Sequence, residues 1–122
     1  MSVEERSAEA RQLAKVAARA ADDKKAERTL VLDVAAVLGI TDYFVITSAS
    51  NRRLVRTVVE AVEEAVREAT GRSPLRIEGL AEQLWVLVDY GDVVVHVFAE
   101  VIRMYYEIER LYRDVPKVPW DD

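Results

Sequence analysis

The sequence predicts a single domain of the α/β class, of the α+β type, in which a mixed sheet of about five strands is covered by three helices. The chain has 122 residues, which is enough for one compact core and too few for two independent ones. Segments whose apolar residues recur every three or four positions alternate with short β-branched runs, in the order α-β-β-α-β-β-β-α. We expect the domain to span residues 1–115 and residues 116–122 to form a short acidic tail.

Composition restricts the class of function. Seventeen basic and 22 acidic residues give a net charge of -5, which disfavours direct binding to DNA or any other phosphate backbone. The chain has no cysteine, which excludes disulfides, thiolate zinc sites and thiol nucleophiles. No apolar run approaches the roughly 18 residues that span a bilayer, and the N-terminus does not resemble a signal peptide. We therefore expect a cytoplasmic protein with no membrane partner.

The chain is predicted to begin with a helix followed by two strands. Ser2 and Glu5 have the spacing of a capping box, and the alanine-rich stretch after them is helical to about Arg28. The runs 29–34 and 43–47 are short and β-branched, which is typical of strands.

A second helix is predicted from about Asn51 to Thr70. Its apolar residues recur at helical spacing, so one face should pack on the sheet. Ser48 or Ser50 is the expected N-cap, and Gly71 the expected stop.

Three strands are predicted next, of which two form a hairpin. Residues 75–78 indicate a short strand. The apolar runs 84–89 and 93–98 are joined by the turn Tyr90-Gly91-Asp92, so we expect them to be neighbouring buried strands.

The last predicted element is a helix over about residues 100–113. One side of it carries an apolar set that we expect to pack inward: Val101, Tyr105, Ile108 and Tyr112.

The predicted hairpin carries a family resemblance. The segment from Trp85 to Phe98, WVLVDYGDVVVHVF, closely resembles the central signature of the ribosomal silencing factor family, which includes the Iojap-related proteins. Similarity extends over about residues 20–115, in the segments Asp23-Lys24-Lys25-Ala26, Leu32-Asp33, Thr41 to Ile46, Ser50-Asn51-Arg52, Glu78-Gly79 and Arg103 to Leu111. The sequence departs from the family pattern at Tyr112, where tryptophan is expected, and at Gln83-Leu84.

The resemblance implies a function. Such proteins bind the large ribosomal subunit through ribosomal protein uL14 and sterically block its association with the small subunit, which represses translation. It also implies a fold similar to that of nucleotidyltransferases without their catalytic site, with no enzymatic activity, cofactor or bound metal. The chain has no Gly-Ser pair and no Asp-x-Asp, which a nucleotidyltransferase metal site would need. Two alternatives are a homodimeric regulatory or assembly module that uses the same surface and, against the missing motifs, a nucleotidyltransferase-like enzyme.

The candidate partner-binding residues combine carboxylates with aromatic anchors, a chemistry suited to a basic protein. They are Glu82, Trp85, Asp89, Tyr90, Asp92, Arg103, Tyr106 and Glu109. Strand alternation places Trp85 and Asp89 on one face and Tyr90 on the other.

Structural roles are the competing interpretation for several of these side chains. A tryptophan such as Trp85 also suits a core position, and Asp89 and Asp92 suit the capping of their own turn. Arg103, Tyr106 and Glu109 have the spacing of solvated pairs on an exposed helix face. His96 stands among valines and is expected to be partly buried and satisfied.

Overall fold

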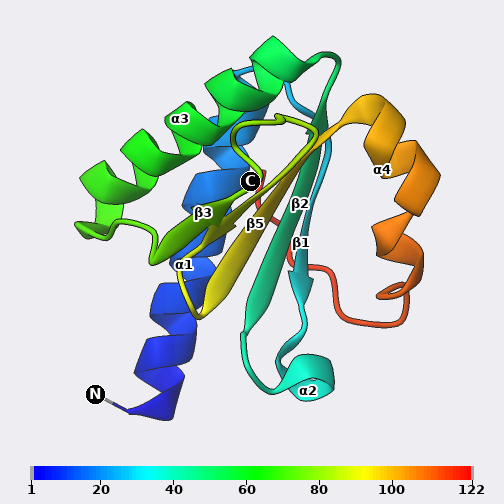
Figure 1. Cartoon of the computed structure of the whole chain (residues 1–122). Helices are drawn as coiled ribbons and strands as arrows, with labels where there is room; N and C mark the ends of the chain where they lie inside the picture. The colour runs from blue at the N-terminus through cyan, green and yellow to red at the C-terminus, as the bar shows by residue number, and fades with distance from the viewer. Residues whose placement is uncertain (1, 122) are drawn as a thin grey trace.

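The computed structural model describes residues 2–121, so Met1 and Asp122, the outermost residues of the two predicted ranges, lie outside the described residues. The helices are α1 (Val3–Asp23), α2 (Ala35–Leu38), α3 (Arg52–Thr70) and α4 (Glu100–Tyr106), and a 3-10 turn, η1, covers Ile108–Arg110. The strands are β1 (Glu27–Asp33), β2 (Tyr43–Ala49), β3 (Arg76–Glu78), β4 (Trp85–Asp89) and β5 (Val93–Ala99). Figure 1 shows their arrangement along the chain.

The five strands form one mixed sheet in the order β1-β2-β5-β4-β3. Strands β2 and β5 are parallel, and the other neighbours are antiparallel. The predicted α+β class and five-stranded sheet are therefore confirmed, as is the hairpin, in which Trp85 pairs with Phe98 and Asp89 with Val94.

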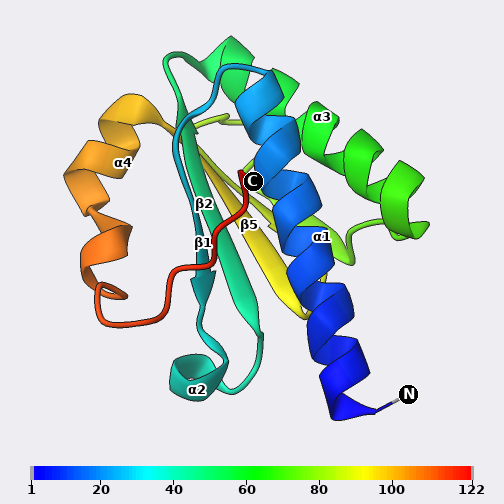
Figure 2. The same cartoon turned by 180° about the vertical axis from the view of Figure 1, so that it is seen from behind.

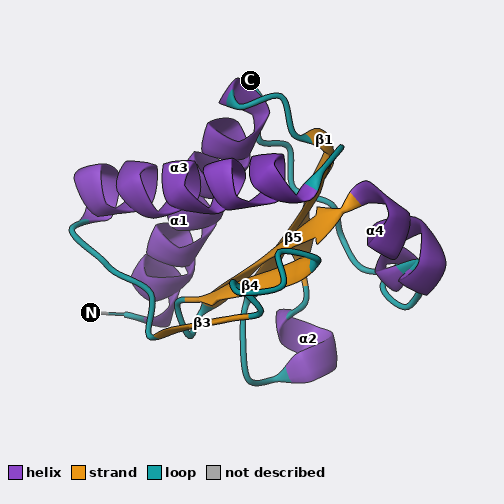
Figure 3. Cartoon of the chain, turned by 45° about the horizontal axis from the view of Figure 1, so that its top comes forward, coloured by secondary structure: helices purple, strands orange, loops and turns teal. Residues whose placement is uncertain are grey.

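Helices α1 and α3 cover one face of the sheet, and α2 and α4 lie on the other side (Figure 3). Helix α1 packs through small side chains, because five of its alanines and Leu13 have no exposed surface. Helix α3 buries a valine stripe, consisting of Val55, Val58, Val59, Val62 and Val66. These residues and the inward side chains of the strands form the main core.

The ends of these two helices follow simple capping chemistry, with one correction. Ser2 and Glu5 form the predicted capping box at the start of α1. The N-cap of α3 is Asn51, whose side chain accepts a hydrogen bond from the Leu54 amide at 2.8 Å, and not Ser48 or Ser50. Gly71 ends α3 in the left-handed region, as predicted.

Two helix ends differ from the predicted ones. Helix α1 stops at Asp23 and not near Arg28, because Lys25 takes a φ of 69° and the chain enters β1 at Glu27. Helix α4 stops at Tyr106, because Glu107 has a φ of 47° and the chain continues as η1. The predicted inward set of the last helix is therefore divided: Ile108 is buried, whereas Val101 and Tyr105 are 68% and 78% exposed.

The face of the sheet opposite α1 and α3 is called the open face below. A second, smaller core occupies one part of it, where Ile108, Tyr112 and Val115 pack on side chains such as Leu32, Phe44 and Phe98. Helix α2 lies on this side as well (Figure 3), and its Leu38 packs against the smaller core.

The predicted tail runs along the outer edge of β1 (Figure 2). The Val118 amide donates to the Val31 carbonyl at 2.8 Å, and the Trp120 indole donates to the Thr29 carbonyl at 3.0 Å. Val118 is buried and Trp120 packs against the main core. The segment thus covers an edge that would otherwise expose unpaired backbone groups.

Candidate partner-binding surface

Strand β4 divides its side chains between the two faces of the sheet. Val86, Val88 and Tyr90 point into the main core, and Tyr90 is only 1% exposed. Trp85, Leu87 and Asp89 lie on the open face and are partly exposed. The assignment of Trp85 and Tyr90 to opposite faces thus agrees with the alternation of the strand, and Tyr90 lies away from any surface.

Trp85 lies at the boundary between the smaller core and the solvent. Its ring stacks on Phe98 at 4.8 Å between centroids and lies 5.4 Å from the ring of Tyr106. Its indole N–H donates to Nδ1 of His96 at 3.2 Å. Tyr106 is 56% exposed, so the two aromatic rings form a surface whose inner side is anchored in the core.

His96 is buried more deeply than expected. The ring is 4% exposed, and burial lowers its pKa to about 4, so the imidazole is neutral near pH 7. Phe44 packs against it edge to face at 4.5 Å. The expectation of a satisfied histidine is met at Nδ1 only, because Nε2 has no hydrogen-bond partner.

The two hairpin aspartates are paired within the molecule. Asp89 accepts from the Gly91 amide at 2.8 Å and from Arg76 at 3.1 Å, so it caps the turn and ties β3 to β4. Asp92 receives two hydrogen bonds from Arg72, at 3.0 and 2.9 Å. The bond to Asp92 raises the pKa of Arg72. Both aspartates therefore have structural roles within the domain, and these roles compete with binding to a partner.

Arg103 is a buried structural cation and not part of an exposed face. It is 1% exposed and donates to Glu109, to the Glu27 carbonyl and to the Ser48 hydroxyl, at 3.0, 3.2 and 3.1 Å. Burial lowers its pKa. For Glu109, burial opposes ionisation, but hydrogen bonds from its own backbone and from Arg103 bring its pKa below the usual value. Arg103 and Glu109 therefore do not form the expected solvated pair; their hydrogen bonds hold α4 and η1 against the sheet.

The structure brings together only part of the candidate set. Trp85 and Tyr106 are in contact, and Glu82 is exposed in the turn that leads into β4. Asp89 lies at the other end of β4, about 13 Å along the strand at roughly 3.3 Å per residue. Tyr90 and Arg103 are buried, which leaves them no surface for a direct contact in this conformation.

An exposed apolar stripe on α4 was missed by the sequence reasoning. Val101, Met104 and Tyr105 are 68%, 65% and 78% exposed, and Tyr105 contacts Tyr106 edge to face at 5.0 Å. The stripe therefore continues the aromatic surface of Trp85 and Tyr106. The helical spacing of these residues was visible in the sequence, but the same spacing is also typical of a buried face.

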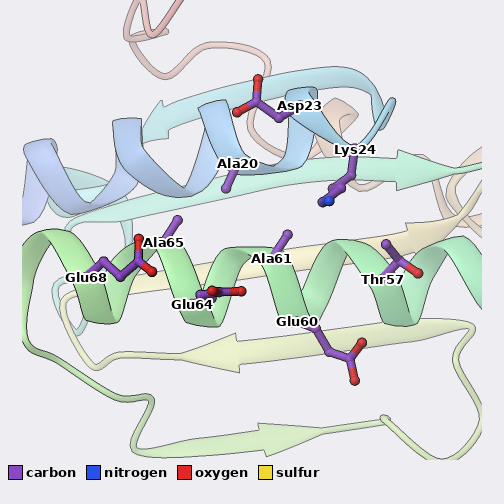
Figure 4. Close-up of a pocket in the computed structure, with 9 residues that line it drawn as sticks. All are labelled: Ala20, Asp23, Lys24, Thr57, Glu60, Ala61, Glu64, Ala65 and Glu68. Carbon is purple, nitrogen blue, oxygen red and sulfur yellow. The ribbon is translucent and has the colours of Figure 1, made fainter.

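A shallow cleft of about 380 Å³ lies on the other side of the molecule, between α1 and α3 (Figure 4). Its walls carry Glu60, Glu64 and Glu68 on α3, with Ala61 and Ala65 between them and Lys24 opposite. Carboxylates four residues apart on one helix repel each other, so this is a solvated acidic face. Within residues 2–121, no three potential ligands are grouped to hold a metal ion, and no helix has the length and apolar character needed to cross a membrane.

Comparison with known proteins gives consistent matches. The family model described as "Ribosomal silencing factor during starvation" matches residues 7–122. The chain is 40% identical over 107 residues to the ribosomal silencing factor RsfS of Bacillus subtilis, covering 88% of this chain and 90% of that relative.

Two solved structures are also similar. A crystal structure from Chromobacterium violaceum matches with a TM-score of 0.80 at 29% identity, covering 92% of each chain. One from Bacillus halodurans has a TM-score of 0.76 at 35% identity, covering 89% of this chain and 98% of the other.

Proposed function

The chain belongs to the ribosomal silencing factor family, and we propose that it binds the large ribosomal subunit through ribosomal protein uL14, blocks joining of the small subunit and so represses translation. The observation that carries this proposal is the family match over residues 7–122, almost the whole domain. Its place of action is then the cytoplasm, where ribosomal subunits join.

The chemistry of the open face supports a protein partner. Trp85, Tyr105 and Tyr106 form an aromatic group that is anchored on one side and exposed on the other. Aromatic side chains held in this way are the usual energetic centres of protein interfaces. Glu82 and the net charge of -5 favour a basic partner, such as a ribosomal protein, over bare rRNA.

The proposed mechanism is steric and needs no catalytic step. A stable interface covers roughly 800 Å² on each partner. That is about one ninth of the 7041 Å² surface of the described chain, which leaves most of the domain as an obstacle on the subunit face.

The test is sedimentation of the purified protein with separated ribosomal subunits on a sucrose gradient. The proposal predicts comigration with free large subunits and a smaller joined-ribosome peak when small subunits are added. Binding without any loss of joining would overturn the silencing step, and absence of binding would overturn the proposal.

Self-association is a second candidate function, and the exposed stripe of Val101, Met104 and Tyr105 favours it. An apolar stripe beside aromatic residues is a surface on which two copies could pair. Because the stripe adjoins Trp85 and Tyr106, pairing would compete with ribosome binding. Sedimentation equilibrium of the free protein, with Met104→Glu as the disrupting variant, separates the two.

A further inference from the structure

A groove of about 600 Å³ lies on the open face, beyond the aromatic surface. It runs between the loop after α2 and strands β3 and β4. Leu87, Val94 and His96 form its floor, and Ile40 and Leu75 stand at its rims. This volume is within the range of ligand-binding pockets, roughly 300–1,000 Å³.

The imidazole on the floor is a hydrogen-bond donor without an acceptor. An indole N–H only donates, so the contact of Trp85 with Nδ1 of His96 requires that Nδ1 carries no proton. The neutral ring then carries its proton on Nε2, and this N–H has no partner among the described residues. A buried donor left in this state is costly, which is why such groups are rare in folded proteins.

A second unpaired polar group lines the same groove. The hydroxyl of Thr41 has no hydrogen-bond partner, and the residue is 6% exposed. Two residues that line one groove, each more than nine-tenths buried, therefore carry unused hydrogen-bonding groups. Both groups are shielded from solvent, so a ligand reaches them only after neighbouring side chains rotate, a common change at interfaces.

The rims indicate the character of the occupant. Ile40 and Leu75 are 86% and 75% exposed, an unusual state for two large aliphatic residues facing one groove. Glu78, also at the groove, forms no ion pair within the described chain, whereas Asp89, which lines the groove as well, is paired with Arg76. The unpaired charge of the groove is therefore negative.

We propose that this groove receives an extended segment of the ribosomal protein partner, in which an apolar side chain lies next to a lysine or arginine. A backbone carbonyl of the segment accepts from Nε2 of His96, the hydroxyl of Thr41 bonds the neighbouring peptide group, and Glu78 pairs with the basic side chain. The inference rests on the proposed function for the identity of the partner. It adds a second anchor, separate from the aromatic surface, and names the residues that select the sequence bound.

The test measures the affinity of variants for purified large subunits by pelleting. Thr41→Val removes the hydroxyl at nearly constant volume, and Ile40→Ser and Leu75→Ser change exposed side chains whose loss leaves the fold intact. Each should weaken binding about three- to tenfold, the scale of one buried hydrogen bond or apolar contact. Thr57→Val on α3 and Val3→Ser on α1 are matched controls on other surfaces and should bind as the unchanged protein does.

Glu78→Lys decides between a basic peptide and rRNA as the occupant. If a basic segment occupies the groove, Glu78→Lys should weaken binding at least about fivefold at low salt. Tighter binding of this variant would indicate an rRNA phosphate in the groove and would overturn the proposal. If the unchanged protein binds and the groove variants bind equally well, the groove is not used and the proposed function stands. If the unchanged protein does not bind, the proposed function fails, and the assignment of the occupant fails with it.

Discussion

Acidification should weaken the fold through His96, the only histidine of the chain. Burial lowers its pKa to about 4 in the folded protein, whereas the unfolded chain has the ordinary value of about 6.5. As the pH falls below 6.5, the unfolded state takes up the proton first, and this favours unfolding. The stability that depends on the neutral ring is complete above about pH 6.5 and is lost as the pH falls toward 4.

The size of the effect follows from these two values. Between pH 7.5 and 5.0 the unfolded histidine becomes almost fully protonated, whereas the folded one takes up about a tenth of a proton. Linkage then gives a loss of about 2 kcal/mol in the free energy of unfolding. Most carboxyl groups stay ionised down to about pH 5, so they contribute little in this window.

Chemical denaturation at pH 7.5 and 5.0 measures the effect, with His96→Gln as the reference. The amide of glutamine does not titrate, so the pH dependence should be smaller by about 2 kcal/mol in the variant. The pKa of Glu63 is raised mainly by burial, so this residue makes the fold more stable as the pH falls. This contribution is the same in both proteins and cancels in the comparison. The ring proton resonance of the single histidine reports its pKa directly by NMR. A midpoint near 6.5, or an equal pH dependence in both proteins, would refute the reasoning.

Four further predictions concern stability and binding. Gly79→Ala should destabilise the fold by at least about 2 kcal/mol in urea denaturation, because φ is +85° and the new Cβ would lie 2.2 Å from the Trp85 carbonyl oxygen; a neutral result would contradict this geometry. Tyr90→Ala should lose about 3 to 5 kcal/mol of stability by leaving a cavity in the main core, and a fully stable variant would show that the ring is not buried. Removal of residues 116–122 should lower the free energy of unfolding by about 2 to 4 kcal/mol, because the contacts of Val118 and Trp120 with the core are lost. Thermal unfolding measures this loss, and an unchanged midpoint would count against the docked segment. Tyr106→Ala should weaken large-subunit binding by about 1 to 2 kcal/mol and change stability by less than about 1 kcal/mol; equal affinity in the pelleting assay would remove Tyr106 from the interface.

The predictable part of the fold is the part set by local periodicity. The alternation of Trp85 to Tyr90 gave the correct face for each side chain, and the valine stripe gave the correct face of α3. Helix α2 has only four residues, which is too short for a periodic pattern. The break at Glu107 interrupts a sequence that is helical in character. In the turn before it, Arg103 donates to the Glu27 carbonyl, to Ser48 and to Glu109, and no local pattern specifies these distant contacts.

The site was less predictable, because its charges are paired with partners distant in sequence. Asp89 and Asp92 stand next to aromatic residues, which suggests a binding surface when only the chain order is known. Their partners are Arg76, the first residue of β3, and Arg72, which lies between α3 and β3. Such pairings follow from the approach of β3 to the hairpin, which no local pattern specifies. The two unpaired groups of Thr41 and His96 are visible only after all hydrogen bonds have been assigned.

These pairings bear on how the molecule would recognise a partner. Three of the acidic candidates, Asp89, Asp92 and Glu109, already form hydrogen bonds to arginines within the domain. To bind a partner's cation they would have to give up or share those bonds, so their gain in binding energy is reduced. The net charge of -5 still attracts a basic partner at a distance, which affects the rate of encounter. In the proposed complex, selection between basic partners then depends on the exposed rings beside Trp85 and on two groups that have no partner within the described chain, the N–H of His96 and the carboxylate of Glu78.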